Sequence, residues 1–173
     1  MISDIHGCYE EYQRLLEKIA FSEKDELYVL GDAVDRGPEP IRVLQDMMER
    51  PGVYPVMGNH DYVALRILGT FRDEATADNL GSSLTRQDLL SCMYWIRDGG
   101  RTTVKSFLAL EPERRREILR YLESFPAYRE AFAGGKRYVL VHGGIEHFDR
   151  SRSLASYDVQ ELAFCRADYD RRY

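Results

Sequence analysis

The chain has 173 residues, 31% of them charged, and a net charge of −5, so one domain with a buried core is expected and non-specific attraction to nucleic acid is not. The longest apolar runs are only a few residues, and no segment resembles a signal peptide, so no membrane partner is expected. Cys8, Cys92 and Cys165 form no C-x-x-C pair, which predicts free thiols. We therefore expect a cytoplasmic protein.

The first part of the chain alternates helix and strand signals. Apolar residues at helical spacing predict a helix from Glu10 to Ile19, and the β-rich run Leu27–Leu30 predicts a strand that ends at a glycine. A second helix is predicted from Pro40 to Met48 and a second strand over Tyr54–Met57, although Pro55 is unusual inside a strand. This alternation is typical of an α/β fold, whose functional groups usually follow the carboxyl ends of the strands.

The middle of the chain, residues 62–129, differs in character and is predicted to be a helical insert. It contains helical patterns over Leu84–Ile96 and Pro112–Leu122. Gly99-Gly100 is interpreted as a stop signal that ends the first of these helices, and the loop after it is a place for substrate-facing groups. The β-rich run Tyr138–Val141 then returns the chain to the sheet.

Residues that favour metals and phosphates occur in four short clusters. Their joint appearance in chain order, the last three each after an apolar run, predicts a site for two divalent metals that cleaves phosphoesters. The clusters are Asp4-Ile5-His6-Gly7, Gly31-Asp32-Ala33-Val34-Asp35-Arg36-Gly37, Gly58-Asn59-His60-Asp61 and His142-Gly143-Gly144.

The first two clusters suggest distinct tasks for their side chains. Asp4 and His6 are separated by one residue, so on an extended chain both point to the same side and can hold one ion. Asp32 can bridge two cations, and Asp35 can orient an imidazole by hydrogen bonding. Arg36 offers a planar fork for a phosphate oxygen. The alternative for Asp35 and Arg36 is a simple surface salt bridge.

The last two clusters contribute an amide and two imidazoles. The carbonyl oxygen of Asn59 is acceptable to a hard cation, and His142 follows an apolar strand as a ligand for a second metal. His60 suits an acid that protonates a departing alkoxide, with Asp35 keeping it charged and aimed, although a lone histidine is more often structural. His147 lies beyond the glycine turn and is expected at the surface.

These motifs, in this order, resemble those of the calcineurin-like metallophosphoesterases, specifically the phosphoprotein phosphatase superfamily with its bacterial serine/threonine phosphatases and symmetrical diadenosine tetraphosphate hydrolases. The resemblance runs from Ser3 to Gly144, and the motif Gly31–Gly37 is highly specific. It implies a metallophosphoesterase-type β-sandwich flanked by helices, with residues 1–173 as one domain and 62–129 as a helical insert. It also implies two divalent metal ions, with manganese favoured and iron or zinc as alternatives.

The resemblance implies a set of metal ligands. Asp4 and His6 would bind the first metal, Asp32 would bridge the two, and Asn59 with His142 would bind the second. The implied reaction is direct attack on phosphorus by a metal-activated hydroxide.

The resemblance further implies the groups that handle the substrate. His60, paired with Asp35, would be the general acid, and Arg36 would hold the substrate phosphate. Arg166, two residues after Phe164, would be a second phosphate-binding arginine.

The chain is expected to be truncated at both ends relative to this family. Only two residues precede Ser3, and no histidine follows Arg166 to complete the second metal site, so the domain is expected to be incomplete at its C-terminus. The alternative is a divergent member with an incomplete second site.

Three functions follow from the resemblance. The favoured one is a two-metal serine/threonine protein phosphatase, whose partners would be phosphorylated proteins. The alternative is a symmetrical dinucleoside tetraphosphate hydrolase, which acts on a phosphorylated small molecule with the same core chemistry. The third is a metal-binding fragment without catalytic turnover.

Overall fold

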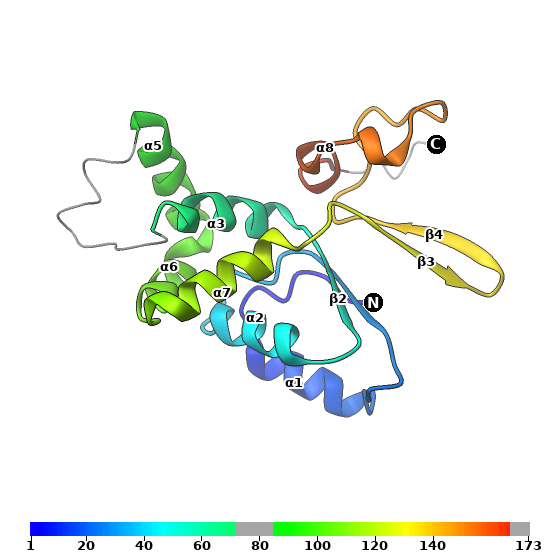
Figure 1. Cartoon of the computed structure of the whole chain (residues 1–173), viewed down its shortest axis with the longest axis horizontal. Helices are drawn as coiled ribbons and strands as arrows, with labels where there is room; N and C mark the ends of the chain where they lie inside the picture. The colour runs from blue at the N-terminus through cyan, green and yellow to red at the C-terminus, as the bar shows by residue number, and fades with distance from the viewer. Residues whose placement is uncertain (72–84, 167–173) are drawn as a thin grey trace.

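The computed structural model describes residues 1–71 and 85–166 and shows a mixed α/β fold (Figure 1). Strands β1 (Leu27–Leu30) and β2 (Val53–Val56) pair in parallel. Ile2 forms an isolated parallel bridge with Val29, so the N-terminal segment lies along the other side of β1. Three chain segments therefore run in the same direction, and their carboxyl ends lie at one edge. The predicted α/β class is confirmed.

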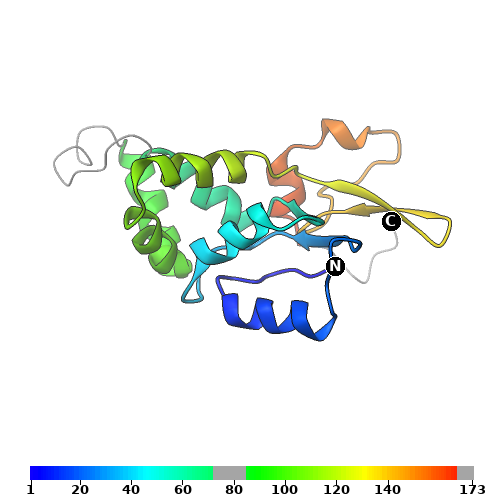
Figure 2. The same cartoon turned by 60° about the horizontal axis from the view of Figure 1, so that its bottom comes forward.

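Two amphipathic helices connect these segments. Helix α1 (Tyr9–Lys18) buries Tyr12 and Leu16, and helix α2 (Pro40–Glu49) buries the apolar side that includes Leu44. Pro40 occupies the first turn of α2, where its missing N–H leaves no intrahelical bond unmade. The two helices lie side by side (Figures 1 and 2). Both helices start within two residues of the bounds predicted from apolar spacing.

A helical part follows β2 and contains the predicted insert. Its elements are α3 (Asn59–Gly69), α5 (Arg86–Trp95), a π-helical turn η1 (Ile96–Gly100), α6 (Arg101–Leu108) and α7 (Pro112–Glu123). Fully buried Leu68, Phe107 and Leu119 join these helices in one core. Because α3 begins at Asn59, the helical part begins directly at the third motif. The treatment of residues 62–129 as an insert within one domain stays a prediction.

The predicted glycine stop is confirmed, because α5 ends at Trp95 and Gly99 in the following turn has a non-helical backbone. The chain passes through η1 and continues at once as α6, a helix that the sequence pattern did not predict. Gly99 has a φ of 114°, a non-helical conformation that separates α5 from α6 by a kink. A Cβ on Gly100 would lie 2.4 Å from the Trp95 ring, so this glycine is needed for close packing. Leu84, the predicted first residue of the helix, lies outside the described residues.

The C-terminal part contains a hairpin and short helices. Strands β3 (Arg129–Ala133) and β4 (Lys136–Leu140) pair antiparallel around a glycine turn and project away from the helices (Figures 1 and 2). β3 was not predicted, because its side chains are largely exposed and show no apolar run. A 3₁₀ turn η2 (Leu154–Ser156) and α8 (Val159–Ala163) follow. Within residues 1–71 and 85–166 the strands form two separate two-stranded sheets, so the predicted return of the chain to the first sheet at Tyr138–Val141 is wrong.

Two further findings concern membrane-spanning helices and cysteines. Among the residues that the structure describes, no helix is both long and apolar enough to cross a membrane. Cys8, Cys92 and Cys165 are free thiols at partly buried positions, as predicted.

Candidate active site

The five predicted metal ligands converge around Asp32. The Asp32 Oδ2 atom lies 3.6 Å from His6 Nε2 and 3.5 Å from His142 Nε2. His6 Nε2 is also 3.6 Å from Asp4 Oδ1, and His142 Nε2 is 3.0 Å from Asn59 Oδ1. Asp32 itself is 3% exposed, so it lies at the buried centre of the group. Residues that are up to 138 positions apart in sequence thus share one site.

Backbone carbonyls orient the two imidazoles that face Asp32. His6 Nδ1 donates to the carbonyl of Val34 at 2.9 Å, and His142 Nδ1 donates to the carbonyl of Leu30 at 2.7 Å. Because a carbonyl only accepts, Nδ1 carries the proton in this hydrogen bond in both rings, and Nε2 is the ring atom that would bind a cation. This arrangement is typical of metal-ligating histidines.

The loops that carry these side chains are strained. Asp4, His6, Asp32, Asp35 and Arg36 all have positive φ, between 47° and 72°. Such a conformation costs non-glycine residues on the order of 1–3 kcal/mol each. Two backbone hydrogen bonds hold the first loop against the second, from His6 N to the carbonyl of Asp32 and from Gly7 N to that of Ala33, both at 2.9 Å. The fold therefore stores strain where the functional side chains are aimed.

Asp61 links the second and third motifs, a role that sequence reasoning missed. Its fully buried carboxylate accepts backbone N–H bonds from Asp32 at 2.7 Å, Ala33 at 2.9 Å, Gly58 at 3.1 Å and Val34 at 3.3 Å. Burial, followed by the negative charge of Asp32, raises the pKa of Asp61 to about 6, although the backbone donors oppose this shift. An acidic residue in the first turn of a helix was the sequence signal for this role.

A second group is built around His60, which is 3% exposed. His60 Nδ1 lies 2.7 Å from Asp35 Oδ2, and Arg36 donates to His60 Nε2 at 2.8 Å and to His6 Nε2 at 2.7 Å. Burial by itself lowers the pKa of His60, but the hydrogen bond to Asp35 and the charges of Asp32 and Asp35 outweigh it, so the pKa is raised. Asp35 is completely buried, so the surface salt-bridge alternative is wrong.

The donor set fits divalent cations. Two groups of carboxylate and imidazole atoms share Asp32, one with Asp4 and His142 and the other with His6 and His60, and within each group the atoms lie within 4.8 Å of one another. Metal–ligand bonds of about 2.1 Å bring neighbouring ligand atoms about 3.0–3.4 Å apart, close to the spacing here. A cation at His6 Nε2 would require the Arg36 guanidinium to withdraw, because that nitrogen has one lone pair.

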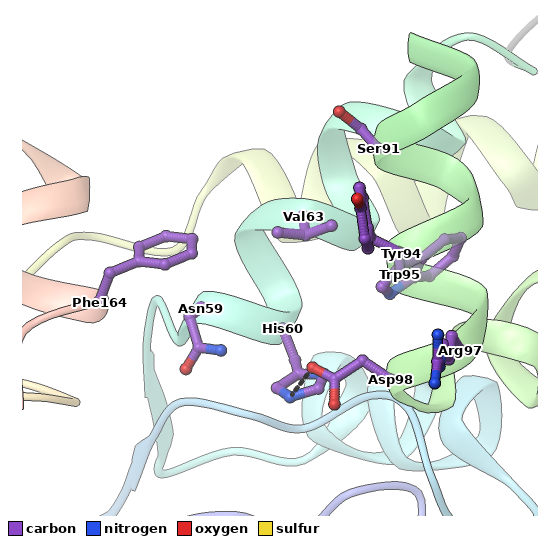
Figure 3. Close-up of a pocket in the computed structure, with 9 residues that line it drawn as sticks. All are labelled: Asn59, His60, Val63, Ser91, Tyr94, Trp95, Arg97, Asp98 and Phe164. Carbon is purple, nitrogen blue, oxygen red and sulfur yellow. Dashed lines mark ion pairs between the residues drawn. The ribbon is translucent and has the colours of Figure 1, made fainter. Parts of the chain in front are cut away.

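A cavity of about 640 Å³ adjoins the metal-ligand cluster (Figure 3). Asn59 and His60 lie at one end, Tyr94 and Trp95 come from α5, and Phe164 faces them from the opposite side. The cavity is further lined by Val63, Ser91, Arg97 and Asp98. Asp98 Oδ2 lies 3.5 Å from His60 Nε2 (Figure 3), so the segment after Trp95 does contribute polar groups to the cavity.

The remaining predicted residues lie outside this group. Arg166 is exposed, and it makes no hydrogen bond or ion pair within residues 1–71 and 85–166, so the structure does not join it to Arg36. Its role in phosphate binding stays a prediction. His147, with 88% of its side chain exposed, is at the surface as predicted.

Comparison with known proteins identifies related sequences. The symmetrical bis(5'-nucleosyl)-tetraphosphatase of Buchnera aphidicola (strain 5A) is 34% identical over 116 residues, which is 66% of this chain and 40% of that protein. The protein of the same name from Shewanella loihica is 39% identical over 98 residues, 56% of this chain and 36% of that protein. The chain therefore matches less than half the length of these relatives.

Comparison with solved structures agrees at the level of the fold. A crystal structure provisionally described as a diadenosine tetraphosphatase matches with a TM-score of 0.54 at 20% identity, covering 93% of this chain and 56% of that one. The sequence profile of the family described as calcineurin-like phosphoesterase matches residues 1–168. With nearly its whole length matched and the motifs of the family gathered around Asp32, this chain belongs to the calcineurin-like phosphoesterases.

Proposed function

We propose that the protein hydrolyses dinucleoside tetraphosphates symmetrically, into two nucleoside diphosphates. The observation that carries the proposal is the cavity beside Asn59 and His60, whose walls include Tyr94 and Phe164 with 73% and 46% of their surfaces exposed. Exposed aromatic rings next to a phosphoester site suit a substrate that has a nucleobase attached to its phosphates. The names of the related tetraphosphatases support the same substrate class.

Divalent metals belong to this proposal. Asp4, His6 and Asp32 would hold one ion, and Asp32, Asn59 and His142 the other. When bound, the metals would activate a water as the nucleophile and offset the negative charge of the phosphoryl oxygens. The mixed oxygen and imidazole donors suit manganese, iron or zinc.

The side chains of the protein then have defined tasks. Arg36, released from His6 and His60, binds non-bridging phosphate oxygens through its planar fork. Water attacks the second phosphorus of the tetraphosphate and loses a proton to solvent, the bond from that phosphorus to the oxygen shared with the third phosphorus breaks, and the electron pair of this bond leaves on that oxygen with a nucleoside diphosphate. His60 Nε2 gives that oxygen a proton, while Asp35 holds the opposite side of the ring.

The serine/threonine phosphatase activity favoured from the sequence stays a prediction. It would use the same ligands, Arg36 and His60, so the core does not distinguish the two substrates. The names of the relatives support the dinucleotide alternative, and no feature of the described residues favours a protein substrate.

Product analysis tests the proposal. Diadenosine tetraphosphate and a phosphoserine peptide are incubated separately with the protein and manganese, and the products are separated by ion-exchange chromatography. We expect two ADP from the dinucleotide, faster than phosphate release from the peptide, and no product with Asp32→Asn. ATP plus AMP, or faster peptide dephosphorylation, would overturn the proposal, and turnover of neither would favour the metal-binding fragment.

A further inference from the structure

The buried carboxylate of Asp35 has two partners besides His60, and both come from the helical part of the chain. Trp95 Nε1 donates to Asp35 Oδ2 at 2.7 Å, the same oxygen that pairs with His60 Nδ1 at 2.7 Å. Thr103 Oγ1 donates to Asp35 Oδ1 at 2.6 Å. Every hydrogen bond of this carboxylate is therefore made away from solvent, since Asp35 and Thr103 are 0% exposed and Trp95 is 3% exposed.

Thr103 fixes both the backbone and the side chain of Asp35. Its hydroxyl accepts from Asp35 N at 2.9 Å while it donates to Asp35 Oδ1. A hydroxyl has one proton, so this pair of bonds sets its rotamer. Asp35 has a φ of 72°, so the Thr103 bond also holds a strained backbone in place.

The π-helical turn brings these two donors to Asp35. Trp95 is the last residue of α5, and Thr103 lies in the first turn of α6, with η1 between them. The turn docks directly on the second motif, because Arg36 N donates to the carbonyl of Gly99 at 2.9 Å. Gly100 lets the Trp95 ring approach the backbone, where any Cβ would collide with it.

We propose that Trp95 and Thr103 are positioning residues, which hold the Asp35 carboxylate so that it aims the His60 ring at the leaving group. The inference rests on the proposed role of His60 as the general acid. Without the two donors, the carboxylate is free to rotate about its terminal torsion, and its buried oxygens lose charge-stabilising bonds. The helical part would thus belong to the proton-transfer machinery as well as to the wall of the cavity.

The proposal has a signature that depends on the leaving group. A general acid matters most when the departing oxygen is basic, as in phenyl phosphate, whose phenol has a pKa of about 10. It matters little for 2,4-dinitrophenyl phosphate, whose leaving group departs as a stable anion. A purely structural role of Trp95 and Thr103 would lower turnover of both substrates alike.

The test compares Trp95→Phe and Thr103→Val with wild type on both aryl phosphates in the presence of manganese. We expect kcat for phenyl phosphate to fall about 10–100-fold with KM little changed, and kcat for 2,4-dinitrophenyl phosphate to fall less than about threefold. Thr103→Ser keeps the hydroxyl and should restore most activity. Ser106→Ala, one turn further along α6 and bonded only to the Thr102 carbonyl, is the matched control.

Equal losses on the two substrates, or no loss on either, would overturn the proposal. The proposed substrate class fails separately: aryl phosphate turnover without dinucleotide hydrolysis would reject the dinucleotide and leave the roles of Trp95 and Thr103 to be decided by the same variants.

A spectroscopic measurement does not depend on turnover. The His60 Nδ1 proton, hydrogen bonded to a carboxylate, is expected downfield in the proton NMR spectrum, and His60→Ala assigns it. We expect the signal in wild type and Thr103→Ser, and its loss or displacement in Trp95→Phe and Thr103→Val. An unchanged signal in both of these variants would overturn the proposal, and the dispersion of the same spectra reports whether each variant is folded.

Discussion

The loops at the carboxyl ends of β1 and β2 and the helical run α5–η1–α6 contribute to the same site in different ways. The loops hold Asp32 in a strained backbone and place Asn59 and His60 next to it. The side-chain atoms of the predicted ligands therefore lie close together. The helical run supplies Trp95 and Thr103, whose side chains donate hydrogen bonds to the carboxylate of Asp35. The difference teaches that the reacting side chains and the residues that position them can come from separate parts of a chain. Only the reacting side chains are clustered in short sequence motifs.

The largest effect is expected at the loops. Asp32→Asn should lower metal content and reduce phosphoester turnover more than about 100-fold, because Asp32 is the carboxylate shared by both ligand groups. Elemental analysis and aryl phosphate kinetics measure the two quantities. Asp25→Asn, a surface carboxylate bonded to Ser22, serves as the control. Full metal content and activity in Asp32→Asn would show that the loops are not needed for metal binding or turnover, and the two regions would then not differ as described.

The next effect concerns stability within the same loops. Asp61→Ala leaves four buried backbone N–H groups of the second and third motifs without their acceptor, at a cost on the order of 1–3 kcal/mol per group before relaxation. We expect the free energy of unfolding to fall by at least about 3 kcal/mol, measured by urea denaturation. A change below about 1 kcal/mol would mean that the loops keep their strained form without Asp61.

A smaller effect is expected at the wall of the cavity. Phe164→Ala should raise KM for diadenosine tetraphosphate by about 10-fold, since stacking of a base on an aromatic ring is worth about 1–3 kcal/mol. Turnover of phenyl phosphate, which has no nucleobase, should change little. Phe164→Tyr keeps the ring and is the matched control. Equal changes for the two substrates would show that Phe164 acts on the metal-ligand cluster and does not serve only as a wall of the cavity.

The smallest effect lies outside both regions, near α8. Hydrogen bonding to Arg152 lowers the pKa of Glu161 from 4.5 to about 2. The unfolded chain therefore binds more protons between these values, so the stabilisation is present above about pH 4.5 and is lost as the pH falls toward 2. Glu161→Gln should flatten this acid-side loss of stability slightly, measured as Tm against pH, without changing kcat. A change in kcat would show that α8 influences the active site.

The sequence predicted the residues of the candidate site better than the residues that hold them in position. Asp4, His6, Asp32, Asn59 and His142 were predicted together from the joint appearance of four clusters in chain order, and in the structure each lies within 3.6 Å of at least one other. Asp61 stands in the same motif as Asn59, but its role depends on backbone groups of another loop, which no local pattern shows.

Helices and strands were likewise predicted where a local apolar pattern specifies them and missed where it does not. β1, α1, α2 and α7 bury regular apolar stripes, so local periodicity is enough to predict them. β3 and α6 were missed, the first because pairing with β4 stabilises exposed side chains, and the second because α6 begins directly after the glycine stop at Gly99-Gly100.

The sequence by itself determined the family, the α/β class and the side chains of the candidate site, because these depend on residue identity and on short-range spacing. Only the tertiary structure decided that Trp95 and Thr103 meet Asp35, 60 and 68 residues away in the chain. A hydrogen bond between distant segments depends on how helices pack and where a π-helical turn changes direction. Those are properties of the whole fold, and no single segment encodes them.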